Sequence, residues 1–309
     1  MTSTSEVGDH LLVGDGHRLY FEVHGRGIPA VVLHGGPGSG VSRRQLEFFD
    51  LDRFRVLLFD QRGAGLSQPA GSLVANTTEH LVADLELLRQ AQGIERWVVF
   101  GGSWGSTLAL AYARRYPQRV IGMVLRGVFL GTAGEVDWFF RGLRRFLPAA
   151  WAEFAQQTSG VNLLAAYHAV LTGEDAARAA GAAARWRDWE DAVMVLSNGA
   201  PAAQSTGGSA PASARDLNKF RIQAHYLVNR CFLPRPLLRE VSRFATIPAV
   251  IVQGQHDFVT PPRSAGELAA SWRRARLSLV TRGGHDPFMP EMAQALRAGL
   301  NELAEIPER

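Results

Sequence analysis

Lysine and cysteine are almost absent from this chain of 309 residues. The single cysteine, Cys231, excludes an intramolecular disulfide and any zinc site that needs several thiolates, and we expect it to be a small buried residue. Nine histidines are present, but none shows the spacing of metal ligands. We therefore expect an enzyme or binding protein that uses no metal and no cofactor.

Long apolar runs are also missing. No stretch reaches the roughly 18 apolar residues that suggest a transmembrane helix, and residues 1–10 lack the basic and apolar regions of a secretory signal. We expect a cytoplasmic protein that does not bind membranes. The net charge of +4 comes from arginines that are interspersed with acids and form only short clusters, so we expect no nucleic-acid partner.

The most informative stretch present is G-G-S-W-G at 101–105, which places Ser103 between two glycines. A short β-prone run at 97–100 precedes it, and a helix-forming run that Pro117 ends follows it. Strand, sharp turn and helix form the setting of a nucleophile elbow, where glycines let neighbouring backbone pass closely. Because G-x-S-x-G is a weak signal in a chain with 32 glycines, its meaning depends on partners for Ser103.

A nucleophilic serine needs a base and an orienting carboxylate. In α/β-hydrolases these follow the serine in the order acid, then histidine. Asp257 follows a predicted strand at 247–253, and His285 follows another at 276–280. Open α/β sheets bind ligands at the carboxyl ends of their strands, so we predict that Asp257 is the acid and His285 the base.

Three other residues compete for these roles. Asp286 adjoins His285, but neighbouring side chains diverge in an extended or turn segment. His256 adjoins Asp257 and is interpreted as a loop residue. Asp60 precedes the serine, which is the wrong chain order, and is interpreted as a structural turn residue.

A glycine-rich segment at 34–40 follows a predicted strand at 30–33. Its backbone can approach a substrate oxygen closely, so we predict an oxyanion hole formed by the N–H groups of Gly36 and Trp104. A phosphate-binding loop is also rich in glycine, but it would need a lysine within G-x-x-x-x-G-K-[ST]. The only lysine, Lys219, stands far away in the sequence.

These patterns predict an α/β fold: an α/β-hydrolase core with a mostly parallel sheet and an inserted helical cap. We assign 1–132 and 235–309 to the core and the alanine- and arginine-rich segment 133–234 to the cap, with its own small core of Trp138, Phe139, Phe140 and Trp151. Thr78 is expected to cap a helix that ends near Gln92. A Gly/Pro/Ser/Ala segment at 197–214 predicts a mobile linker, either an idle surface loop or a flap that gates the site.

Three motifs together resemble the proline iminopeptidase family, serine aminopeptidases of the α/β-hydrolase fold that release N-terminal proline. They are H-G-G-P-G at 34–38, D-Q-R-G-A-G-L-S at 60–67 and G-G-S-W-G-S at 101–106, and the resemblance extends from about Leu19 to Pro290. It implies the same site residues: Ser103, Asp257 and His285 as the triad, with Gly36 and Trp104 as the oxyanion hole.

The resemblance also implies a site for the amine of the substrate. The cap pattern W-x-x-W-E is present at 186–190, so Glu190 inherits the role of binding the charged N-terminus. Gln223 occupies the place of the family's second glutamate within 220–227. A neutral amide attracts an ammonium group less than a carboxylate does. We therefore expect weaker binding of free amino termini, or a changed substrate.

The sequence thus predicts acyl transfer through Ser103 on a short peptide or amide with an N-terminal proline. Hydrolysis of another small amide or ester, such as an amino-acid derivative in specialised metabolism, is the alternative among enzymes. A non-catalytic binding protein on the same fold is the alternative from another class, and the intact Ser–Asp–His set argues against it.

Overall fold

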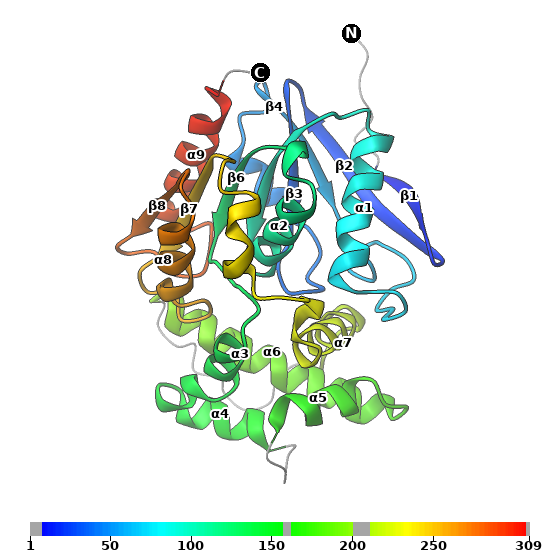
Figure 1. The fold of residues 1–309 in the computed structure, drawn as a ribbon. Helices are drawn as coiled ribbons and strands as arrows, with labels where there is room; N and C mark the ends of the chain where they lie inside the picture. Colours follow the sequence, from blue (N-terminus) through cyan, green and yellow to red (C-terminus); the bar gives the residue numbers. More distant parts are fainter. Residues whose placement is uncertain (1–7, 157–161, 200–210, 307–309) are drawn as a thin grey trace.

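A central eight-stranded sheet crosses the molecule in the computed structural model, which describes residues 8–156, 162–199 and 211–306 (Figure 1). The strand order is β1-β2-β4-β3-β5-β6-β7-β8. The β1–β2 and β2–β4 pairs are antiparallel and all other neighbours are parallel, which confirms the predicted sheet. The strands are β1 (Asp9–Gly14), β2 (His17–Gly25), β3 (Ile28–Leu33), β4 (Phe54–Phe59), β5 (Trp97–Gly102), β6 (Val120–Arg126), β7 (Ala249–Gly254) and β8 (Ala275–Val280).

Helices cover both faces of this sheet. Helices α1 (Thr78–Ala91), α2 (Trp104–Arg115) and α8 (Pro262–Ser271) contribute to one apolar cluster. Helix α9 (Pro290–Ala304) and the 3₁₀ helix η1 (Arg43–Phe48) contribute to a second cluster on the opposite face. Strands β5 and β7 are consequently buried at every position, as their continuous apolar runs require.

Within the described residues, further helices form a separate layer beside the sheet (Figure 1). They are α3 (Ala133–Phe140), α4 (Pro148–Ala155), α5 (Leu163–Leu171), α6 (Ala176–Asn198) and α7 (Ala214–Val228). The layer has its own apolar cluster around Trp186, Trp189 and Phe154. Of the four aromatic residues expected in this core, Phe140 is buried, and Trp138, Phe139 and Trp151 pack partly buried against the cluster.

Two helix ends differ from the sequence-based expectation. Thr77, and not Thr78, caps α1: its side chain accepts from the His80 N–H, while the Thr78 hydroxyl donates to the carbonyl of Cys231. Helix α6 continues through Asn198, so the first two residues of the predicted linker are helical. Most of that linker, 200–210, lies outside the described residues.

The Cys231 thiol is fully buried, and this burial raises its pKa to about 12. None of the described helices combines the length and apolarity needed to cross a membrane. A cytoplasmic location stays a prediction.

Candidate active site

Ser103 lies in a strained turn between β5 and α2, with φ 57° and ψ −125°. The glycines around it are needed because three backbone segments meet there. A Cβ at Gly105 would lie 2.0 Å from the carbonyl oxygen of Leu33, and a Cβ at Gly101 would lie 2.4 Å from that of Gly105. Only glycine permits this approach, so the turn has the geometry of a nucleophile elbow.

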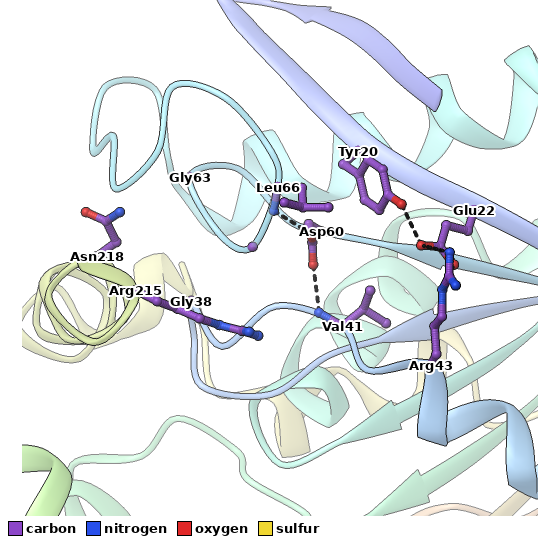
Figure 2. Close-up of a pocket in the computed structure, with 11 residues that line it drawn as sticks. Tyr20, Glu22, Gly38, Val41, Arg43, Asp60, Gly63, Leu66, Arg215 and Asn218 are labelled. Carbon is purple, nitrogen blue, oxygen red and sulfur yellow. Dashed lines mark hydrogen bonds and ion pairs between the residues drawn. The ribbon is translucent and has the colours of Figure 1, made fainter. Parts of the chain in front are cut away.

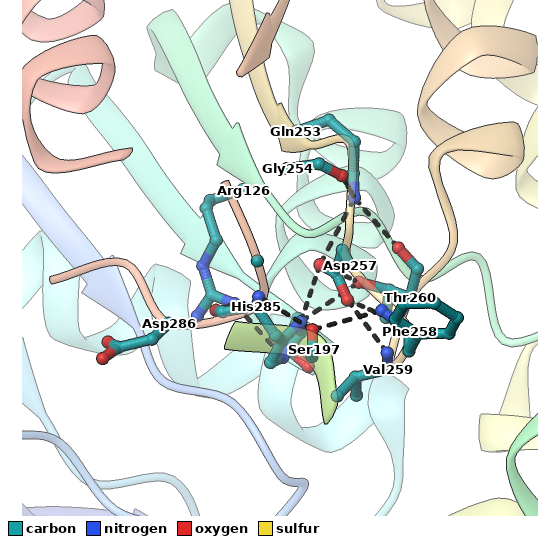
Figure 3. A network of polar contacts seen from close by, with 12 residues as sticks. Arg126, Ser197, Gln253, Gly254, Asp257, Phe258, Val259, Thr260, His285 and Asp286 are labelled. Atoms are coloured by element: carbon teal, nitrogen blue, oxygen red, sulfur yellow. Dashed lines mark hydrogen bonds and ion pairs between the residues drawn. The ribbon is translucent and has the colours of Figure 1, made fainter. Parts of the chain in front are cut away.

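Asp257 and His285 form a buried pair at the carboxyl ends of β7 and β8 (Figure 3). An Asp257 carboxylate oxygen, Oδ2, lies 2.8 Å from His285 Nδ1, and Oδ1 accepts from the N–H of Thr260 at 2.8 Å. Burial alone would raise the pKa of Asp257, but its electrostatic interaction with His285 and these hydrogen bonds hold it below its usual value. Asp257 therefore stays ionised and orients the imidazole ring.

Arg126, which sequence reasoning missed, contacts the other side of the same ring. Its Nη1 donates to the carbonyl of His285 at 2.8 Å and lies 3.2 Å from His285 Nε2. A guanidinium can only donate, so Nε2 is the accepting nitrogen and Nδ1–H donates to Asp257. This is the tautomer that a general base requires. The available signal was the arginine that directly follows the largely apolar run at 120–125.

Within the described residues no hydrogen bond joins the Ser103 hydroxyl to His285; Nε2 of His285 contacts Arg126 instead. Catalytic hydrogen bonds are often absent or long without substrate and tighten when it binds. Both side chains nevertheless line one cavity, so the structure brings the predicted nucleophile and base to the same place.

Ser197, assigned to a linker from the sequence, connects the last turn of α6 to the loops that carry Asp257 and His285. Its hydroxyl oxygen accepts from the N–H groups of His285 and Phe258, each at 3.1 Å, and its hydroxyl lies 3.2 Å from the carbonyl of His256. The Asp286 carboxylate accepts from the Phe288 N–H instead and points away from the His285 ring (Figure 3). The helical layer thus holds the loops that carry Asp257 and His285.

A buried network of His34 and Gln61 fixes the glycine-rich loop next to Ser103. Burial lowers the pKa of His34, which keeps its ring neutral: Nε2 accepts from the Gln61 N–H at 3.0 Å, and Nδ1 donates to the Gly35 carbonyl. The Gln61 amide oxygen accepts from the Trp104 indole at 2.8 Å. The network joins the loop to the start of α2, and Gly36 lines the cavity beside Ser103.

The cavity has a volume of about 380 Å³, and its wall on the side of the helical layer includes Glu190, Gln223 and Lys219. The Lys219 ammonium group forms an ion pair with Glu190 Oε2, and the Gln223 amide donates to Glu190 Oε1 at 2.8 Å. Lys219 is remote in sequence from the glycine-rich loop, but a Cβ at Gly38 would lie 3.0 Å from its carbonyl oxygen. Sequence reasoning missed that the lone lysine belongs to this site.

A second cavity, of about 410 Å³, includes Gly38 and Val41 from the glycine-rich loop and its continuation (Figure 2). Asp60 accepts from the Val41 and Leu66 N–H groups at 2.7 and 2.8 Å, so its carboxylate holds a turn. Within 8–156, 162–199 and 211–306, no three His, Cys, Asp or Glu side chains gather as they would around a metal ion.

Comparisons with known proteins agree with this geometry. Residues 29–291 match the α/β hydrolase fold family. A proline iminopeptidase from Xylella fastidiosa is 43% identical over 300 residues, covering 93% of this chain and 94% of the relative. One from Neisseria gonorrhoeae is 39% identical over 303 residues and covers 95% of each chain. This chain belongs to the proline iminopeptidase family.

The plant proline iminopeptidase from Arabidopsis thaliana is also similar, with 41% identity over 296 residues that cover 93% of this chain and 77% of the relative. Solved structures show the same fold at lower identity. A bromoperoxidase from Bacillus anthracis has a TM-score of 0.60 at 18% identity, covering 97% of this chain and 100% of that one. Membership of the proline iminopeptidase family confirms the resemblance found in the sequence and makes this chain an enzyme.

Proposed function

We propose that this enzyme is a prolyl aminopeptidase that hydrolyses the bond after an N-terminal proline in a short peptide or amide. The observation that carries the proposal is the buried Asp257–His285 pair, of which His285 lines the same cavity as the strained Ser103. The 43% identity to a proline iminopeptidase over nearly the whole chain supports the choice of substrate.

In the proposed mechanism, His285 Nε2 takes the proton of Ser103 as Oγ attacks the prolyl carbonyl carbon. Arg126 gives up its contact with Nε2 at this step and keeps its bond to the His285 carbonyl. The N–H groups of Gly36 and Trp104 stabilise the oxyanion.

The imidazolium then protonates the leaving nitrogen, and the first product departs. Water, deprotonated by His285, next attacks the acyl group on Ser103 and releases proline. Throughout, Asp257 holds the ring orientation and stabilises its positive charge.

We assign the N-terminal end of the substrate to Glu190 and Gln223, which line the same cavity as Ser103. Both come from the helical layer, so we also propose that 133–234 is a cap inserted into the core. In this arrangement the cap binds the N-terminus and the core carries the nucleophile. The distance between the two would then limit how many residues can precede the scissile bond.

A substrate panel tests this function. We expect prolyl 7-amido-4-methylcoumarin to be cleaved with a higher kcat/KM than the alanyl amide. Ser103→Ala should lower kcat by roughly 10³–10⁶-fold without changing the melting temperature. Cleavage of a simple ester with no turnover of any prolyl amide would favour the alternative amide or ester hydrolase. Failure of a fluorophosphonate to label Ser103 would favour a binding protein.

A further inference from the structure

The only lysine of the chain lies in the catalytic cavity, on α7 and one turn before Gln223. Its ammonium group pairs with one oxygen of Glu190, and the Gln223 amide donates to the other. The enzyme's own donors therefore occupy both carboxylate oxygens of the residue proposed to bind the substrate N-terminus. A substrate ammonium group would have to compete with Lys219 for Glu190.

The Lys219–Glu190 pair is partly buried, so its charges affect which groups can bind in the cavity. The side chains of Lys219 and Glu190 are 24% and 19% exposed. Charges in such a partly buried place are screened by salt much less than fully exposed ones. Glu190 thus contributes little net attraction for a second cation, and the ammonium group of Lys219 repels one.

The neighbouring Asp191 does not replace the negative charge of Glu190 that Lys219 neutralises. It lines the same cavity, but burial and the adjacent Glu190 both raise its pKa, which weakens it as an anchor for an ammonium group. Glu135, the other carboxylate in the cavity wall, already accepts from the Leu130 N–H and the Ser264 hydroxyl.

An ammonium group carries three N–H donors and no acceptor. Lys219 uses one donor for Glu190, so it can offer another to an oxygen of a bound molecule. The charge of Glu190 is already balanced by Lys219, and the Lys219 ammonium group can still donate a hydrogen bond. The group that suits this place is therefore uncharged and carries an acceptor oxygen. A nitrogen that carries an acyl group meets both conditions, because acylation removes the positive charge and adds a carbonyl.

We propose that Lys219 is a specificity-determining residue that adapts this subsite to an N-acylated prolyl residue, with the acyl oxygen accepting from its ammonium group. The proposal rests on the proposed function, since it concerns the substrate of the same Ser103. It extends the substrates of the enzyme to amides whose N-terminal nitrogen is blocked.

The test compares three substrates: prolyl and N-acetylprolyl 7-amido-4-methylcoumarin, and a simple ester without an amine. We expect the wild-type enzyme to cleave the N-acetylprolyl amide. Lys219→Met should lower kcat/KM for that substrate roughly tenfold and raise it for the prolyl amide by a similar factor, the size of one hydrogen bond. Arg263→Met removes one exposed positive charge from α8 and should leave both values unchanged.

The ester reports whether the catalytic residues are intact in each variant. If Lys219→Met does not fold, Lys219→Gln and Lys219→Arg take its place, and only the arginine variant should keep the wild-type ratio. Prolyl turnover with no N-acetylprolyl turnover, or a ratio that Lys219→Met leaves unchanged, would overturn the proposal while the proposed function stands. A ratio that responds to Asp191→Asn instead would place the amine at Asp191. Turnover of the ester alone would contradict both proposals.

Discussion

At the scale of single residues, the environment of Asp257 explains why one carboxylate and not its neighbour can orient the imidazole. Asp257 is enclosed and accepts from the His285 ring and from backbone N–H groups, so its charge is stabilised without water. Asp286 adjoins His285 in sequence, but its carboxylate accepts from Phe288.

We therefore expect Asp257→Asn to lower kcat by about 10⁴-fold, because an amide does not select the required imidazole tautomer. Asp286→Asn is the matched control and should retain near-wild-type kcat. Steady-state kinetics on a prolyl amide at neutral pH measure both. Loss of activity in the Asp286 variant together with a functional Asp257 variant would show that the acid is wrongly assigned.

At the scale of elements, helix α6 holds the loops that carry Asp257 and His285 through the hydroxyl of Ser197. Ser197→Ala leaves the N–H groups of His285 and Phe258 without this acceptor. We expect the free energy of unfolding to fall by about 1–3 kcal/mol and kcat to fall roughly tenfold or more as the ring moves. Ser271→Ala, on the exposed side of α8, should change neither quantity. An unchanged kcat in the Ser197 variant would mean that the loops hold their geometry without α6.

The packing of β3, β5 and α2 leads to a second prediction for the elements. Gly105→Ala would place a Cβ against the Leu33 carbonyl, and backbone cannot move aside as a flexible side chain can. We expect a loss of about 3 kcal/mol in unfolding free energy and of most activity. Gly266→Ala, in α8 with nothing within 4 Å of the new Cβ, should stabilise the enzyme by about 0.5–1 kcal/mol. Denaturant unfolding measures the free energy of unfolding of both variants. Equal changes in Gly105→Ala and Gly266→Ala would refute the packing argument.

At the scale of the whole molecule, acid should weaken the fold partly through Glu22. Burial alone would raise its pKa, but hydrogen bonds from Arg43 and Tyr20 (Figure 2) and from His24 lower it from 4.5 to about 2. A lowered folded-state pKa gives stability that is present above pH 4.5 and is lost as the pH falls toward 2.

Glu22→Gln should therefore lower the unfolding free energy at pH 7. We expect a loss of only about 1–2 kcal/mol, because Arg43 is partly exposed and solvent screens its charge. The difference from wild type should shrink as the pH falls from 4.5 toward 2. Thermal melts over this range measure it, with the exposed Glu47→Gln as the control. A gap between wild type and variant that persists at pH 2 would contradict the linkage.

The sequence by itself determined the parts of this protein that depend on local pattern and chain order. The glycines around Ser103 predict a turn because only they fit where backbone segments meet, and the buried runs before Asp257 and His285 predict parallel strands. The carboxyl ends of such strands meet at one edge of the sheet, so the pairing of Asp257 with His285 could be predicted without coordinates.

Only the tertiary structure decided which distant side chains surround that pair. Arg126 is 159 residues from His285 and Ser197 is 88 residues from it, and their contacts depend on sheet register and on how α6 packs. The Lys219–Glu190 pair likewise forms only because α6 and α7 pack side by side. The sequence of either helix alone does not specify that packing. Side-chain contacts across packed elements have no local signature in the sequence, because they depend on the relative placement of whole elements.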